Sequence, residues 1–75
     1  MKLRELRLRK FMTLKDLAER AGVGVSTITA IESGRELPAM RTAKRLAEAL
    51  QVEPGEIDEA RTAAERAIQR GKVAA

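Results

Sequence analysis

The sequence contains no cysteine, histidine, asparagine, tryptophan or tyrosine, and only one phenylalanine. Without cysteine, neither a disulfide framework nor a thiolate metal site can form, which favours a reducing compartment. Without histidine, the chain lacks the side chain most used for proton transfer near neutral pH and for metal binding. No glycine-rich phosphate loop follows a strand pattern, and the carboxylates show no convergent arrangement. We therefore expect no enzyme, no metal and no cofactor.

Long apolar runs are also missing. No apolar stretch approaches about 18 residues, so we expect neither a membrane span nor a membrane partner. A chain of 75 residues makes one small domain, and a domain of this size buries only roughly 60% of its unfolded surface. The sequence thus predicts a cytoplasmic protein with one compact core.

Charge is unevenly distributed along the chain. Residues 1–45 carry eleven basic and five acidic side chains, whereas residues 46–75 carry four and six. A basic first part followed by a mildly acidic end favours contact of the first part with a polyanion. Solvated helix surfaces with a chance imbalance explain the charge equally well.

The spacing of apolar residues is helical throughout, and no stretch alternates long enough to predict a strand. Helices are expected over about residues 2–10, 14–21, 25–33, 40–50 and 54–71. Thr13 is the expected N-cap of the second helix, with Asp16 completing a capping box. Gly22 and Gly34 are expected to end the second and third helices. The fourth helix is expected to bury a stripe made of Met40, Ala43, Leu46, Ala47 and Leu50.

The expected fifth helix has a different character. Pro54 fits its first turn, and its apolar stripe is mostly alanine. Such a stripe buries little area and permits close packing of another helix, so a homodimer contact is one interpretation. A partly frayed end packed on the protein's own core is the other. The stripe consists of Ile57, Ala60, Ala64, Ala67 and Ile68.

Residues 14–34 form two short amphipathic segments joined by a glycine-containing turn. Ala18 leaves room for a second helix to cross closely, and Gly22 supplies the positive φ that a sharp turn needs. Ile28 and Ile31 are placed to close this crossing from below. The arrangement is that of a helix-turn-helix, and it leaves one face of the third helix outside, where a recognition helix meets the major groove. That face is made by Val25, Ser26, Thr29 and Ala30.

An ordered set of sequence pieces extends over residues 3–57. The pieces are LRELR from Leu3, LAERAGV from Leu17, STI from Ser26, IESG from Ile31, the single Pro38, and LAEAL from Leu46. Each piece alone is weak, but the set in this order resembles the lambda-repressor-like helix-turn-helix family, also called the Cro/cI or XRE type. Residues 1–57 are therefore interpreted as a DNA-binding domain. Residues 58–75 are interpreted as a helical extension and a candidate dimerisation segment.

The resemblance implies an all-α bundle of five helices in which the second and third form the helix-turn-helix. It implies a transcriptional regulator, expected to be a repressor, that binds double-stranded DNA specifically as a homodimer at a palindromic operator. A bacterial or phage-encoded protein associated with the nucleoid is expected. By resemblance, Arg7 and Glu32 form an internal, structural ion pair, against the alternative of two independent surface charges. The resemblance also implies that Val25, Ser26, Thr29 and Ala30 face the bases.

Cations near the entrance of the third helix are expected to contact phosphates and to supply most of the affinity. By resemblance, Arg35 and Arg41 flank the loop that touches the DNA backbone, although ordinary solvated charge explains any one cation equally well. Thr13 and the free amides at the start of the second helix are further candidates. The full predicted set is Thr13, Lys15, Arg35, Arg41, Lys44, Arg45, Arg9 and Lys10.

The sequence departs from the family pattern where DNA contact is expected. The base-facing set contains no arginine, glutamine or asparagine, the long planar donors that direct readout favours. Leu14 stands where the family commonly has a polar residue, and Ala39 stands where a capping serine is usual. Exposed apolar surface is also indicated at Leu8, Phe11, Leu14 and Leu37. The alternative function is therefore a helix-turn-helix protein-interaction module, or an antitoxin-like partner protein, with weak or no DNA readout.

Overall fold

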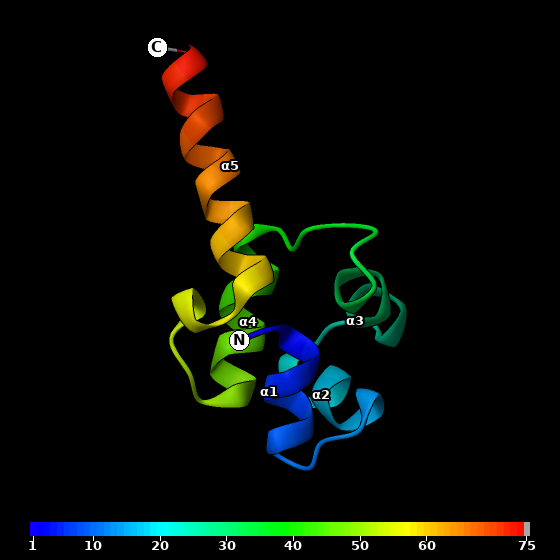
Figure 1. Ribbon diagram of the computed structural model, residues 1–75. Helices are drawn as coiled ribbons and strands as arrows, with labels where there is room; N and C mark the ends of the chain where they lie inside the picture. The colour runs from blue at the N-terminus through cyan, green and yellow to red at the C-terminus, as the bar shows by residue number, and fades with distance from the viewer. Residues whose placement is uncertain (75) are drawn as a thin grey trace.

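The computed structural model describes residues 1–74, and it describes side chains for residues 1–71. Within that part the chain forms five α-helices and no strand, so the all-α prediction is confirmed. Figure 1 shows α1 to α4 gathered in one body, from which α5 projects. No helix in the described residues is both long and apolar enough to cross a membrane. The elements are α1 (Leu3–Arg9), α2 (Leu14–Ala21), α3 (Val25–Glu32), α4 (Met40–Leu50), a 3-10 turn η1 (Pro54–Glu56) and α5 (Asp58–Ala74).

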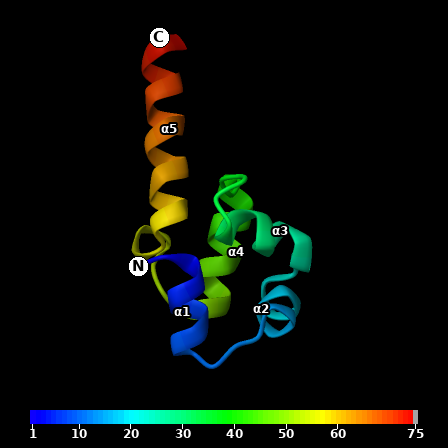
Figure 2. The same ribbon diagram turned by 45° about the vertical axis from the view of Figure 1, so that its right-hand side comes forward.

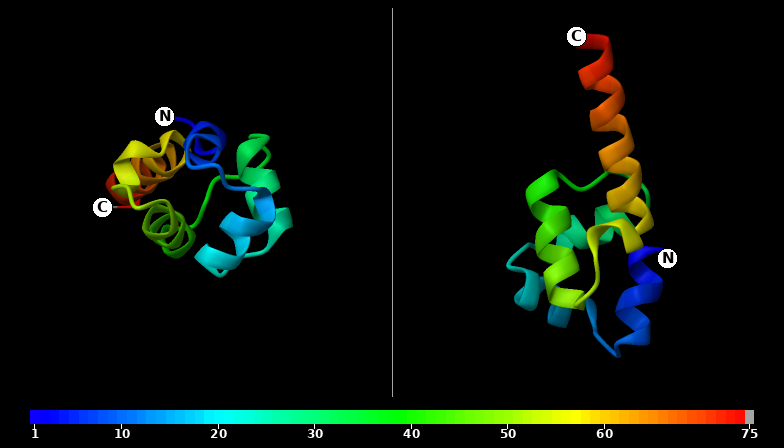
Figure 3. Two further views of the ribbon diagram at one scale, coloured as in Figure 1. Left: turned by 90° about the horizontal axis from the view of Figure 1, so that it is seen from below. Right: turned by 90° about the vertical axis from the view of Figure 1, so that its left-hand side faces the viewer.

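The helices divide between two sides of the molecule. Seen from below, α2 and α3 lie together on one side, and α4 and the start of α5 lie on the other (Figure 3). The contacts between α2 and α4 join the two sides, while α1 contacts α3. Figure 2 shows that α5 extends upward, away from α2 and α3. The end of α5 therefore lies far from the helix-turn-helix.

Apolar side chains from all five helices and from the residue before α5 meet in one core. Fully burying a side chain such as leucine or isoleucine contributes roughly 1.5–3 kcal/mol relative to leaving it exposed. Ile28 and Ile31 are buried under the crossing of α2 and α3, as the helical spacing predicts. The largest fully buried side chains are Leu3, Leu17, Ile28, Ile31, Leu46, Leu50 and Ile57.

The ends of α2 follow from local sequence chemistry. The Thr13 hydroxyl accepts a hydrogen bond from the Asp16 amide at 3.0 Å, and the Asp16 carboxylate accepts one from the Thr13 amide at 3.0 Å. Gly22 ends the helix with a φ of 70°, in the left-handed region that glycine adopts without strain. The predicted capping box and glycine end are both confirmed.

The predicted buried stripe of α4 is wrong at one position. Ala43, Leu46, Ala47 and Leu50 are buried, but Met40 is 62% exposed. Met40 is the first residue of α4, so its side chain lies beyond the edge of the core, next to the loop that joins α3 to α4.

The fifth helix also differs from the prediction. Pro54 opens the 3-10 turn η1, and α5 begins only at Asp58. Between them Ile57 is extended, with φ −91° and ψ 115°, because its side chain turns into the core and is 0% exposed. The helix continues past Gly71 to Ala74. At the other end of the predicted stripe, Ile68 is 58% exposed, because it lies on the side of α5 turned away from the loop between α3 and α4.

Candidate nucleic-acid interface

The outward face of α3 is built from short side chains. Ile28 and Ile31 anchor the helix in the core, which leaves Val25, Ser26 and Thr29 exposed on the other side. Ala30, predicted to face outward with them, is only half-exposed. No bulky side chain on this face holds a partner away from the helix backbone.

The two hydroxyl groups on this face differ in what they can still bind. The Thr29 hydroxyl donates to the Val25 carbonyl oxygen at 3.0 Å. Its remaining lone pairs can accept from a base amino group, whereas donation would first require breaking that bond. Ser26 forms no side-chain hydrogen bond with the described residues, so its hydroxyl is free to donate as well as accept.

A hollow of about 410 Å³ lies beside this face, along Ser26 and Ala30. The Arg35 amide donates to the Ala30 carbonyl oxygen at 2.9 Å, which folds the following loop back onto α3. The Ser33 hydroxyl donates to the same carbonyl at 3.1 Å and accepts from Nε of Arg35 at 3.2 Å. The guanidinium is thereby held at this edge of α3. We call the hollow beside Arg35 the Arg35 hollow; it is lined by Ser26, Thr27, Ala30, Arg35 and Glu36.

A second hollow, of about 290 Å³, lies on the side of α3 that faces α1. It brings exposed Arg4 of α1 beside Thr29 and Leu14. Arg4 was not among the predicted phosphate ligands. The sequence does place Arg4 three residues before Arg7, on the same face of α1, and this spacing could have indicated that Arg4 lies near α3. We call this the Arg4 hollow; it is lined by Arg4, Arg7, Leu14, Thr29, Glu32 and Ser33.

The ion pair implied by the resemblance forms beneath this second hollow. Nε of Arg7 donates to Oε2 of Glu32 at 2.8 Å, and Nη2 donates to Oε1 at 3.0 Å. Nη1 donates to the Met12 carbonyl oxygen at 3.0 Å, and the two charged side chains are only 9% and 10% exposed. The hydrogen bonds to Glu32 raise the pKa of the Arg7 guanidinium, so it stays charged. The pair fixes α1 and the loop before α2 to the end of α3.

The other predicted phosphate ligands are exposed but dispersed. Arg9 and Lys10 lie at the end of α1, and Lys15 lies in the first turn of α2, so these three share the corner between the two helices. The remaining cations, Arg41, Lys44 and Arg45, lie along α4.

The capping box limits the hydrogen bonds that Thr13 can offer a phosphate. The Thr13 amide and that of Asp16 are both used by the capping box. The hydrogen bond from the Thr13 amide lowers the pKa of the Asp16 carboxyl, which therefore stays ionised at the start of α2. A phosphate at that helix end would meet this negative charge, and Thr13 retains only its hydroxyl proton as a donor.

The two crossing helices, the tight glycine turn between them and the exposed face of α3 define a helix-turn-helix protein. A family described as helix-turn-helix matches residues 3–57, from the start of α1 to the residue before α5. The chain belongs to this family, the Cro/cI type of DNA-binding helix-turn-helix regulators. No curated protein and no solved structure matches the chain. Residues 58–75 lie outside the family match.

Proposed function

We propose that the protein is a sequence-specific transcriptional regulator, acting as a repressor, that places α3 in the major groove of double-stranded DNA. The observation that carries this proposal is the exposed face of α3 between the Arg35 hollow and the Arg4 hollow. Short side chains let the helix backbone come close to the base edges, while a guanidinium on either side can reach phosphates. Residues 1–57 would suffice for this contact, and the bacterial or phage nucleoid is its proposed location.

The test is selection of bound duplexes from a random pool, followed by fluorescence anisotropy of the enriched sequence. We expect enrichment of a short palindrome, with the two recognition helices about 34 Å apart, one turn of DNA. Absence of binding to any duplex at low salt, by protein with a native circular dichroism spectrum, would contradict the proposal.

Base preference is expected to depend on Thr29. Replacing Thr29 with alanine removes a hydroxyl acceptor from the exposed face, and one such hydrogen bond contributes roughly 1 kcal/mol, or about fivefold in discrimination. The measurement is anisotropy with the selected duplex and with variants at each position. Thr62→Ala, which changes the same residue type on α5, is the control. Unchanged preference in Thr29→Ala would mean that α3 is not placed as proposed.

We also propose that the regulator is a homodimer and that α5 contributes to the contact. Support comes from Ile68, whose apolar side chain on α5 is 58% exposed. Ile68→Glu would put a charge into that contact and is expected to turn a dimer into a monomer in sedimentation velocity. Gln69→Glu adds the same charge about 100° around the helix and should leave the dimer intact. A wild-type protein that stays monomeric even on a palindromic duplex would refute the dimer.

A second candidate function is a helix-turn-helix module that binds another protein. The observation that favours it is Phe11, which is 94% exposed with Leu8 beside it at 52%. Phe11 also has a φ of 56°, a backbone conformation that glycine adopts easily and that strains a residue with a bulky side chain. Phe11→Gly should therefore fold at least as stably as the wild type. If the wild type binds one duplex specifically, the protein is not a protein-binding module that has lost DNA recognition.

A further inference from the structure

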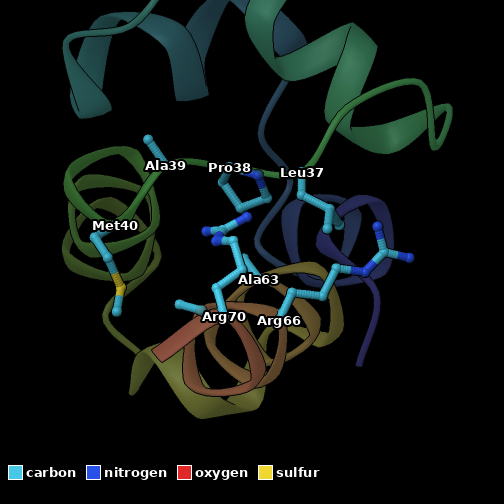
Figure 4. Close-up of a pocket in the computed structure, with 8 residues that line it drawn as sticks. Leu37, Pro38, Ala39, Met40, Ala63, Arg66 and Arg70 are labelled. Carbon is cyan, nitrogen blue, oxygen red and sulfur yellow. The ribbon is translucent and has the colours of Figure 1, made fainter. Parts of the chain in front are cut away.

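A groove lies where the loop between α3 and α4 passes α5. Its volume is about 300 Å³. Figure 4 shows Met40 on one side of it, Leu37 on the other, and Arg70 reaching between Pro38 and α5. The lining contains two guanidiniums and no carboxylate. We call it the α5 groove; it is lined by Leu37, Pro38, Ala39, Met40, Ala63, Arg66, Ala67 and Arg70.

The α5 side of this groove has a regular pattern. Ala63, Arg66, Ala67 and Arg70 follow one another at i, i+3, i+4 and i+7, so they form one stripe along the helix. The alanines allow another helix to approach closely. The two arginines are one turn apart, about 6 Å along the axis. Opposite them, Met40 is 62% exposed and offers a flexible apolar side chain that adapts to a partner.

We propose that the α5 groove docks an amphipathic helix of a partner protein that carries two carboxylates four residues apart. These carboxylates have the same spacing along their helix axis as Arg66 and Arg70 have along α5. Both pairs form at once when the Arg66 side chain, which points past Leu37 in Figure 4, turns toward the groove beside Arg70. The apolar face of the partner helix covers Ala63, Ala67 and Met40. This is binding of a helix in a groove, with charge setting the register.

A second copy of this chain does not supply the matching charges. No helix within residues 1–74 carries two acidic residues four positions apart. The proposed dimer contact also uses a different side of α5, because Ile68 lies about 160° around the helix from Arg70. The partner helix and the dimer contact can therefore coexist.

The α5 groove is also separate from the face proposed for DNA. It is lined by α5, by Met40 and by residues 37–39 of the loop, whereas the Arg35 hollow is lined by α3 and by Arg35 and Glu36. One protein can thus bind a duplex and a partner helix at the same time. Docking of the partner helix in the α5 groove does not depend on DNA binding.

Three synthetic helical peptides test the proposal against the full chain. Each has about 16 residues and is stapled, because short helices are marginal in water. One carries leucines and a glutamate pair at i and i+4; the second has glutamines in place of the pair; the third has the glutamates at i and i+2. We expect the first to bind about tenfold more tightly than the second, which forms neither ion pair, and about threefold more tightly than the third, which forms only one. Amide shifts in NMR spectra should be confined to residues 37–40 and 63–70.

Two double variants with the same loss of charge locate the site. Arg66→Ala/Arg70→Ala should weaken binding of the first peptide about tenfold. Arg9→Ala/Lys10→Ala, at the other end of the body, should leave it within about twofold. Alanine is the best helix former, so the α5 variant keeps its helix, and circular dichroism verifies this.

Several results would overturn the proposal. Equal binding of the three peptides, or equal weakening by both double variants, would indicate only general charge attraction. Loss of duplex affinity in Arg66→Ala/Arg70→Ala would assign these arginines to phosphates. Loss of the dimer in that variant would assign the groove to a second copy.

Discussion

Replacing Arg7 or Glu32 with alanine is expected to lower the free energy of unfolding by about 3–5 kcal/mol, because each change leaves its partner charged, buried and unpaired. The two side chains are only 9% and 10% exposed, and the guanidinium makes three hydrogen bonds that join α1, α3 and the Met12 carbonyl. A chain of 75 residues has a total stability of roughly 4–11 kcal/mol, so either loss removes much of it.

Urea unfolding followed by circular dichroism measures this effect, and a double-mutant cycle separates its parts. Arg7→Ala/Glu32→Ala should cost less than the sum of the two single alanine changes, because it leaves no unpaired charge. Asp58→Ala, which breaks the exposed ion pairs of Asp58 with Arg61 and with the N-terminal ammonium of Met1, provides the comparison. A loss below about 1 kcal/mol in Arg7→Ala would class the pair with ordinary surface salt bridges.

Raising the salt concentration from about 50 to 200 mM is expected to lower the affinity for the selected duplex about a thousandfold. Three arginines per protomer would give a dimer about six phosphate contacts, and each contact releases counterions from DNA. The proposed three are Arg4 and Arg35, which flank the exposed face of α3, and Arg41 at the start of α4.

Arg35→Ala should flatten the slope of log K against log salt by about two, one contact from each protomer, and weaken all sequences alike. Arg66→Ala removes the same charge from α5 and should leave the slope unchanged. Anisotropy titrations at four or more salt concentrations give these slopes. Equal slopes for the wild type and Arg35→Ala would show that Arg35 contacts no phosphate.

Local sequence patterns predicted most of the helix boundaries. The capping box of Thr13 and Asp16 and the left-handed Gly22 involve neighbours in sequence, so their chemistry is readable without the fold. The errors fell where an element leaves the core. Met40 and Ile68 continue an apolar helical stripe, but no other element covers them. The periodicity of apolar residues shows which residues share a helix face. It cannot show how far along that face a neighbouring element extends and covers them.

The candidate site divides in the same way. The face of α3 followed from the spacing of Ile28 and Ile31, which must point into the core. Arg4 was missed because its proximity to Thr29 depends on how α1 crosses α3, a contact between residues distant in sequence. Thr13 stays a predicted phosphate ligand, with its hydroxyl proton as the donor that the capping box leaves.

The sequence by itself determined the helical class, the helix-turn-helix and the outward face of α3, because these depend on period, caps and glycine positions within a few residues. Only the tertiary structure decided which cations flank α3, how α5 leaves the body and where Arg66 and Arg70 meet the loop before α4. The physical reason is that hollows form between elements, and their lining depends on crossing angles and on where core packing stops.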